Sequence, residues 1–137
     1  MLHALLAMLA AATQLLSSEP EPVARASVVV ETSTLREAGA GPAIALRVRS
    51  SAAAMLRAAL IAEGGGPDDP VVAVTVRPLP GAAIGYSSTV AVLHEGRSLA
   101  FRRQRCSLCT ERELVARVER SLAGLAPRLR SLAAGGS

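Results

Sequence analysis

The stretch around Gly96 places the strongest constraint on the fold, because its pattern is that of a β-hairpin. Residues 86–93 and 98–104 are two runs of strand-forming composition, separated by a short connection that contains Glu95 and Gly96. Two-residue connections with glycine are typical of antiparallel strand pairs, since their turn residues adopt positive φ angles that glycine tolerates. The sequence therefore predicts a hairpin with Glu95 and Gly96 at its turn.

The second arm of this hairpin also alternates. Leu99 and Phe101 fall on one face, and Arg103 and Arg105 continue that face beyond the expected core. Successive side chains of a strand point to opposite sides of the sheet, so these four residues share one side.

Three more runs have the composition or the period of strands. Residues 27–32 and 71–76 are rich in valine. Residues 43–49 alternate apolar and other side chains, with Ile44, Leu46 and Val48 at the apolar positions. A period of two predicts a half-buried strand, and we expect one at each run.

Two further runs have the period of helices. Serines at residues 50–51 are suited to cap a helix over residues 52–63, which the glycines from Gly64 onward end. Thr110 and Glu113 have the spacing of a capping box, in which each side chain bonds the other residue's backbone. A second helix is therefore expected from this point to about residue 133.

The second helix carries an apolar row at steps of three and four residues. The row has two interpretations: the core face of a docked helix, or a seam exposed to a protein partner or to a second copy of the chain. Gly124 and Pro127 predict a break or a kink near its middle. The candidate interface residues are Val115, Val118, Leu122, Leu125 and Leu129.

Together these elements predict an α+β domain in two layers. A mixed or antiparallel sheet of about five strands is packed by two helices, in the order β-β-α-β-β-β-α. The expected domain spans residues 27–133, and residues 134–137 are expected to be a disordered tail. The chain has 137 residues, which is the length of one domain.

Composition limits the class of partner. All fifteen basic residues are arginines, as in a bacterial protein from a GC-rich genome, and the formal net charge is +4. Tyr86 and Phe101 are the whole aromatic inventory. Nucleic-acid binding is not expected, because it calls for a denser basic surface with stacking aromatics. The modest positive charge favours anionic surfaces weakly.

The N-terminus has the pattern of an export signal. Residues 4–16 form an apolar run with the length of a signal-peptide core, shorter than a membrane span. Residues 24–26, Ala-Arg-Ala, have the small-x-small form that signal peptidase cleaves, and residues 17–26 are expected to be a Pro/Glu linker. A periplasmic or secreted location follows. The alternatives are an uncleaved signal anchored in the inner membrane, which would be the only membrane contact, and an apolar first helix docked on the domain.

Cys106 and Cys109 form the one motif with chemical potential. They lie between an expected strand and the start of a helix, where the helix dipole favours a thiolate. Locally this C-x-x-C resembles the thioredoxin-like active site, which implies a redox dithiol. The alternatives are a structural disulfide in an oxidising compartment, half of a zinc site shared between two chains, and inert thiols.

Other candidate chemistry is sparse. His94 is expected in a solvated turn, and Asp68 and Asp69 in a Gly/Pro loop. We therefore expect no catalytic residue, metal site or cofactor. The sequence predicts a non-enzymatic exported module that binds or assembles with an unknown protein of the cell envelope. The alternative is a thiol–disulfide redox protein that uses Cys106 and Cys109.

Overall fold

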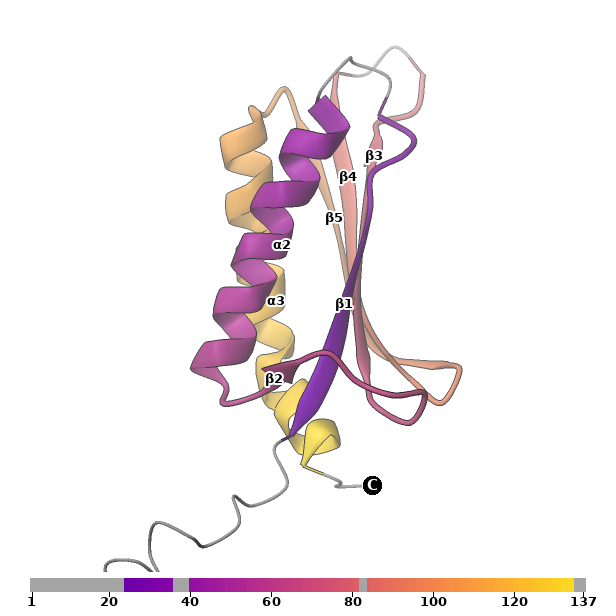
Figure 1. Ribbon diagram of the computed structural model, residues 1–137. Coiled ribbons are helices and arrows are strands. Elements are labelled where there is room, and N and C mark those ends of the chain that lie inside the picture. Colours follow the sequence, from indigo (N-terminus) through magenta and orange to yellow (C-terminus); the bar gives the residue numbers. More distant parts are fainter. Residues whose placement is uncertain (1–23, 36–39, 82–83, 135–137) are drawn as a thin grey trace, which may run out of the picture.

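The computed structural model describes residues 24–35, 40–81 and 84–134. In this part of the chain two helices and a five-stranded mixed sheet form two layers, so the predicted α+β class is confirmed. Figure 1 shows both helices on one face of the sheet. The elements in chain order are β1 (Arg25–Glu31), α2 (Ala40–Ala58), β2 (Ala62–Glu63), β3 (Val71–Pro78), β4 (Gly85–His94), β5 (Arg97–Ser107) and α3 (Glu111–Ala133).

The strands lie in the spatial order β2-β1-β3-β4-β5. β1 is parallel to β2 and to β3, and α2 leads from β1 to β2 across the face of the sheet. β3, β4 and β5 are antiparallel neighbours. The parallel strands β2, β1 and β3 at one side and the antiparallel meander of β3, β4 and β5 at the other make the sheet mixed.

Alternation along the strands builds the core. Each central strand sends every second side chain toward the helices, and the valines of β3 and β4 on that side are buried. α2 and α3 pack against these valines and against each other. The buried strand residues are Ala26, Val72, Val74, Val76, Ser88, Val90, Val92 and Cys106.

Residues 43–49 are the main correction to the predicted elements. They were expected to form a strand, but they lie within α2, and the fifth strand is instead the two-residue β2 after this helix. Three apolar residues at a spacing of two fit a strand, but Ile44 and Val48 also begin a spacing of four that continues through Ala52 and Leu56. Those four are buried, whereas Leu46 is 70% exposed. The longer helical row overrides the short alternation.

The limits of α2 also differ from the prediction. Pro42 lies in its first turn, where a missing backbone donor is tolerated. The serines expected to cap a helix lie inside α2, and the Ser51 hydroxyl donates to Glu119 of α3 at 2.8 Å. The helix ends at Ala58, five residues before its predicted end, and Leu60 follows with a φ of 60°.

The hairpin and the start of α3 follow the prediction. Glu95 and Gly96 have φ angles of 53° and 76°, so both turn residues are in the left-handed region. At the N-terminus of α3, the Glu113 amide donates to the Thr110 hydroxyl at 3.2 Å. Of the break or kink predicted at Gly124 and Pro127, the break is wrong, since α3 is one helix through both residues. Both are exposed, and the buried row continues on the opposite side.

The N-terminal limit of the domain moves by two residues. Residues 24–26 were expected in a linker, but β1 begins at Arg25 and Ala26 is fully buried. Ala24 and Ala26 accept backbone hydrogen bonds from Ala62 and Gly64 at 2.8 and 2.9 Å. The apolar run and the rest of the predicted linker lie outside the described residues, as do residues 135–137 of the predicted tail. None of the described helices is long and apolar enough to cross a membrane.

The assignment of residues 43–49 to a helix can be tested with two substitutions. Ile44→Ala is expected to lower the free energy of unfolding by about 2–5 kcal/mol, because it leaves a cavity under a buried position. Leu46→Ala is the matched control and should change it by less than about 0.5 kcal/mol. Urea denaturation measures both. Equal losses at the two positions would contradict the helix, because a strand would bury both.

Candidate functional site

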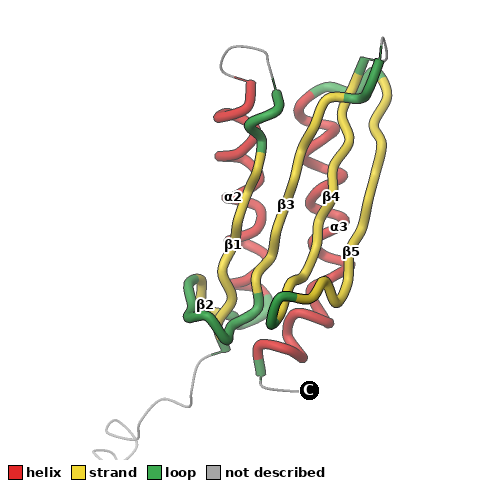
Figure 2. Tube along the Cα trace, turned by 90° about the vertical axis from the view of Figure 1, so that its right-hand side faces the viewer, coloured by secondary structure: helices red, strands yellow, loops and turns green. Residues whose placement is uncertain are grey.

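One face of the sheet is not covered by the helices. Figure 2 looks onto this face, with α2 and α3 behind the strands. Val29 and Phe101 lie on it and are 51% and 61% exposed. Phe101 was expected to belong with the core side of β5, but Ala100 and Cys106 face the helices instead. The open face is therefore the one large surface that the strand alternation leaves to solvent.

Strand register arranges the open face in rows across the sheet. Arg77, Ser87 and Arg105 are register partners on β3, β4 and β5. The next row contains Thr75, Thr89 and Arg103 on the same three strands. These rows and Pro80 line a shallow pocket of about 510 Å³. We call it the arginine pocket, and it is defined by Thr75, Arg77, Pro80, Ser87, Thr89, Arg103 and Arg105.

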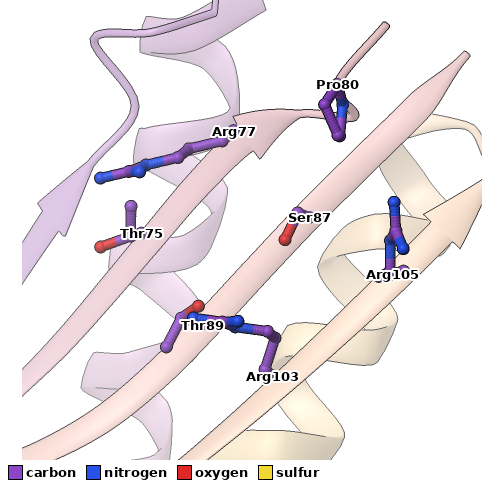
Figure 3. Close-up of a pocket in the computed structure, with 7 residues that line it drawn as sticks. All are labelled: Thr75, Arg77, Pro80, Ser87, Thr89, Arg103 and Arg105. Atoms are coloured by element: carbon purple, nitrogen blue, oxygen red, sulfur yellow. The ribbon is translucent and has the colours of Figure 1, made fainter. Parts of the chain in front are cut away.

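The pocket carries three guanidinium groups and three hydroxyl groups. In Figure 3 the Arg103 side chain lies across β4 toward Thr89, and Arg105 stands off β5. Arg77 extends from β3 toward the β1 side. Among the described residues, no carboxylate forms an ion pair with any of the three arginines. Within the described residues, the three guanidinium groups of the pocket therefore have no ion-pair partner.

Glu31 is the acidic residue near this edge. The Ser33 amide donates to its Oε1 atom at 2.7 Å. Hydrogen bonds from the side chain and the backbone of Ser33 lower the pKa of Glu31, and the positive charge of Arg77 adds to this effect. The carboxylate thus stays ionised at neutral pH, but it is bonded to its own loop and does not line the pocket.

The sequence predicted only part of the arginine pocket. The alternation placed Arg103 and Arg105 together on one face, but it did not pair them with Arg77, Ser87 and Thr89. The missing step was the register of three strands, which the two-residue turn after His94 determines for β4 and β5. The polar residues that alternate with apolar ones in residues 71–78 and 85–94 were the sequence signal that could have identified the rest of the pocket.

An apolar row lies next to the arginine pocket. Val29, Ala73, Ala91 and Phe101 are successive register partners from β1 to β5. None of these four side chains is buried. The open face therefore has a cationic, hydroxyl-rich end and an apolar part beside it.

The second candidate site is the corner between β5 and α3. Cys106 is buried on the core side of the sheet, and Cys109 is half-buried. Their sulfur atoms are at bonding distance, and their Cα atoms are 5.6 Å apart. The pair lies just before Thr110, the N-cap of α3. Leu108, between the cysteines, has a φ of 54° and is exposed. The corner thus joins the end of the edge strand to the start of the helix.

Gly85 fits closely against this corner. It is the register partner of Ser107 and has a φ of 136°. A Cβ atom on Gly85 would collide with the carbonyl oxygen of Cys106. Only glycine permits this approach, so the start of β4 and the cysteine corner depend on each other.

The apolar row of α3 is a core face. The five candidate interface residues, Val115, Val118, Leu122, Leu125 and Leu129, are all buried within one copy of the chain. Val118, Leu122, Leu125 and Leu129 belong to the core cluster between the sheet and the helices, and Val115 is 8% exposed. A groove of about 420 Å³ lies between α2 and α3, and half of the residues that line it are alanines.

The remaining polar candidates have structural partners. The Nε2 atom of His94 donates to the carbonyl of Asp68 at 2.9 Å. The Asp69 carboxylate accepts from the Gly66 amide at 2.7 Å, which holds the loop before β3. Across the described ranges, no three side chains of metal-binding type come together.

Comparison with known proteins gives structural similarities at low identity. No protein-family model and no curated protein matches the sequence. A variant of the PelC dodecamer from Paraburkholderia phytofirmans is 15% identical, with a TM-score of 0.49, over 80% of this chain and 94% of that one. A minor lipoprotein from Acinetobacter baumannii is 15% identical, with a TM-score of 0.35, over 82% of this chain and 94% of that one. A DUF330 protein from Xanthomonas campestris is 17% identical, with a TM-score of 0.39, over 83% and 85%. At these identities the similarity concerns the fold alone.

Proposed function

We propose that this protein is an exported binding module that acts through the open face of its sheet. One observation carries the proposal: no described helix covers the open face, which combines arginines that have no ion-pair partner among the described residues with exposed Val29 and Phe101. Exposed apolar surface rimmed by polar groups is typical of binding sites. The α3 row that the sequence offered as an interface is buried within one copy of the chain, which favours another surface for a partner.

The binding role of the open face can be tested by substitution. Val29→Glu and Phe101→Glu place a charge on the apolar row without touching the core. Leu46→Glu is the control, because Leu46 is as exposed but lies on α2. In cells that lack the gene, the two open-face variants should fail to restore the lost phenotype, while the control restores it. Thermal unfolding should be similar for all three, within a few degrees.

Full rescue by both open-face variants would contradict the proposal. Failure of the Leu46→Glu control to rescue would move the binding surface to the helical layer.

Export is supported by the apolar run at residues 4–16 and by the paired cysteines, which fit an oxidising compartment. The position of cleavage follows from β1. Cleavage after Ala26 would remove both residues of β1 that pair with β2 and a fully buried alanine. We therefore place the signal cleavage upstream of Ala24, so that the mature chain keeps β1 whole.

Mass spectrometry of the mature protein tests this placement. The expected N-terminus is at or before Ala24, in a periplasmic or secreted fraction, with Met1 absent. Intact Met1 in the membrane fraction would support the alternative of an inner-membrane anchor. Intact Met1 in the cytosol would overturn export, and a mature chain that starts at Ser27 would overturn the role given to residues 24–26.

We assign Cys106 and Cys109 to a structural disulfide. Cys106 is 2% exposed and lies among core residues, which restricts attack by another thiol. The alternative is a redox dithiol, favoured by the position of the pair before the N-terminus of α3. The structural assignment is supported by the packing of Gly85 against Cys106, since opening the corner would disturb a strand as well.

The reduction potential separates these two assignments. A structural bond should have a potential below about −300 mV, as measured by equilibration with dithiothreitol buffers. Cys109→Ser should then trap no mixed disulfide in cells. A potential near those of thioredoxins, about −270 mV or higher, together with a trapped partner, would establish the redox alternative.

A further inference from the structure

We propose that the arginine pocket binds a phosphate group. This inference rests on the proposed function, because it names the ligand chemistry of the same open face. The pocket has two cationic side chains on β5, a third on β3, and three hydroxyl groups, one from β3 and two from β4.

Strand geometry brings Arg103 and Arg105 within reach of one ligand, and Arg77 borders the pocket on its β1 side. Arg103 and Arg105 are two residues apart on one strand, which is about 7 Å. Arg77 and Arg105 are separated by β4 alone, so their backbones lie about 10 Å apart. Each guanidinium group ends a long, flexible side chain. The hollow of about 510 Å³ between them is the size of a small-molecule site.

The chemistry of the lining selects an anion. All three charged residues of the pocket are arginines, and no carboxylate lines it. Guanidinium groups match phosphate oxygens with paired, charge-assisted hydrogen bonds. Ser87, Thr75 and Thr89 supply hydroxyl donors on the floor of the pocket, between the arginines. A cation would find no acid in this lining.

A phosphate fits this arrangement better than a carboxylate. Its tetrahedral set of oxygens can accept from Arg103, from Arg105 and from the hydroxyls at the same time, whereas a carboxylate offers two oxygens in one plane. The pocket is shallow and open, so it suits a group that projects from a larger molecule or that diffuses freely. Both sources share the same phosphate chemistry.

The apolar row beside the pocket separates these sources. Exposed Val29 and Phe101 lie in the row of the open face next to the row of Thr75 and Arg103. A phosphate with an apolar substituent therefore gains contacts with this row that inorganic phosphate lacks. A short-chain phosphatidic acid below its micelle concentration is therefore the second probe, next to inorganic phosphate.

The test is a titration of the mature, disulfide-bonded protein at constant ionic strength, followed by the NMR shifts of the arginine Nε–H groups. Inorganic phosphate should shift the signals of Arg103 and Arg105 saturably. The Arg103→Gln/Arg105→Gln variant should bind at least tenfold more weakly, since charge-assisted bonds are lost. Arg120→Gln/Arg128→Gln is the control, because it removes the same charge from exposed positions of α3 and should bind as the parent does.

Arg103→Lys gives a further readout, because it keeps the charge but loses the planar fork. The substitution should weaken phosphate binding, whereas nonspecific electrostatic attraction would leave the affinity unchanged. Tighter, Phe101-dependent binding of the short-chain phosphatidic acid would identify an amphiphile as the source, and equal binding of both probes would identify a free phosphate.

Three results would overturn the proposal: no saturable shift with either probe, equal weakening by the α3 control, or shifts reproduced by acetate at the same ionic strength. Any of these would leave the open-face rescue experiment with Val29 and Phe101 unaffected, so the failure of the phosphate site is distinguishable from the failure of the proposed function.

Discussion

The burial of alternate valines under two helices decides which surface of this protein meets its surroundings. Val72, Val74 and Val76 point toward α2 and α3, and the helices supply their own apolar rows to the same layer. Because a strand has a period of two, the neighbours of these valines must point the other way. With both helices on one side, nothing in the described chain covers those neighbours. The open face is thus a consequence of how the core is built.

The composition of the open face depends on register as much as on sequence. The turn at Glu95 and Gly96 aligns β4 with β5, and the backbone contact between Gly85 and Cys106 closes the other end of this pair. Between these two points, Thr89 meets Arg103 and Ser87 meets Arg105. A slip of one residue would turn the arginines toward the helices. The turn and the cysteine corner therefore act together in positioning the pocket.

Local signals in the sequence were sufficient for most of the elements. The hairpin, the valine-rich strands and the capping of α3 each depend on a few adjacent residues, and each was predictable. Residues 43–49 were not, because their short alternation competes with a helical row that becomes visible only when Ala52 and Leu56 are included. Pro127 failed as a helix breaker for a similar reason: packing on both sides of it outweighs the local cost.

The candidate site was harder to predict than the fold. Arg103 and Arg105 were placed on one face from alternation alone, but their partners come from β3 and β4. Such cross-strand groups depend on the register of β3 against β4 and of β4 against β5, which the pattern within any one strand does not contain. The apolar row of α3 shows the opposite problem. Its pattern was read correctly, but the choice between core and interface depended on what packs against it.

The position of β5 at the edge of the sheet affects how the protein behaves at high concentration. β5 is the outermost strand of the sheet in the described chain, and eleven residues of its backbone border solvent on one side. Long, regular edges of this kind invite a strand from another molecule to pair with them. Here the edge carries Arg97, Arg102, Arg103 and Arg105, and the irregular register near Leu93 bends its pairing with β4. Two copies that approached edge to edge would bring like charges together, so the same arginines that equip the surface for a ligand also oppose fibrous self-assembly.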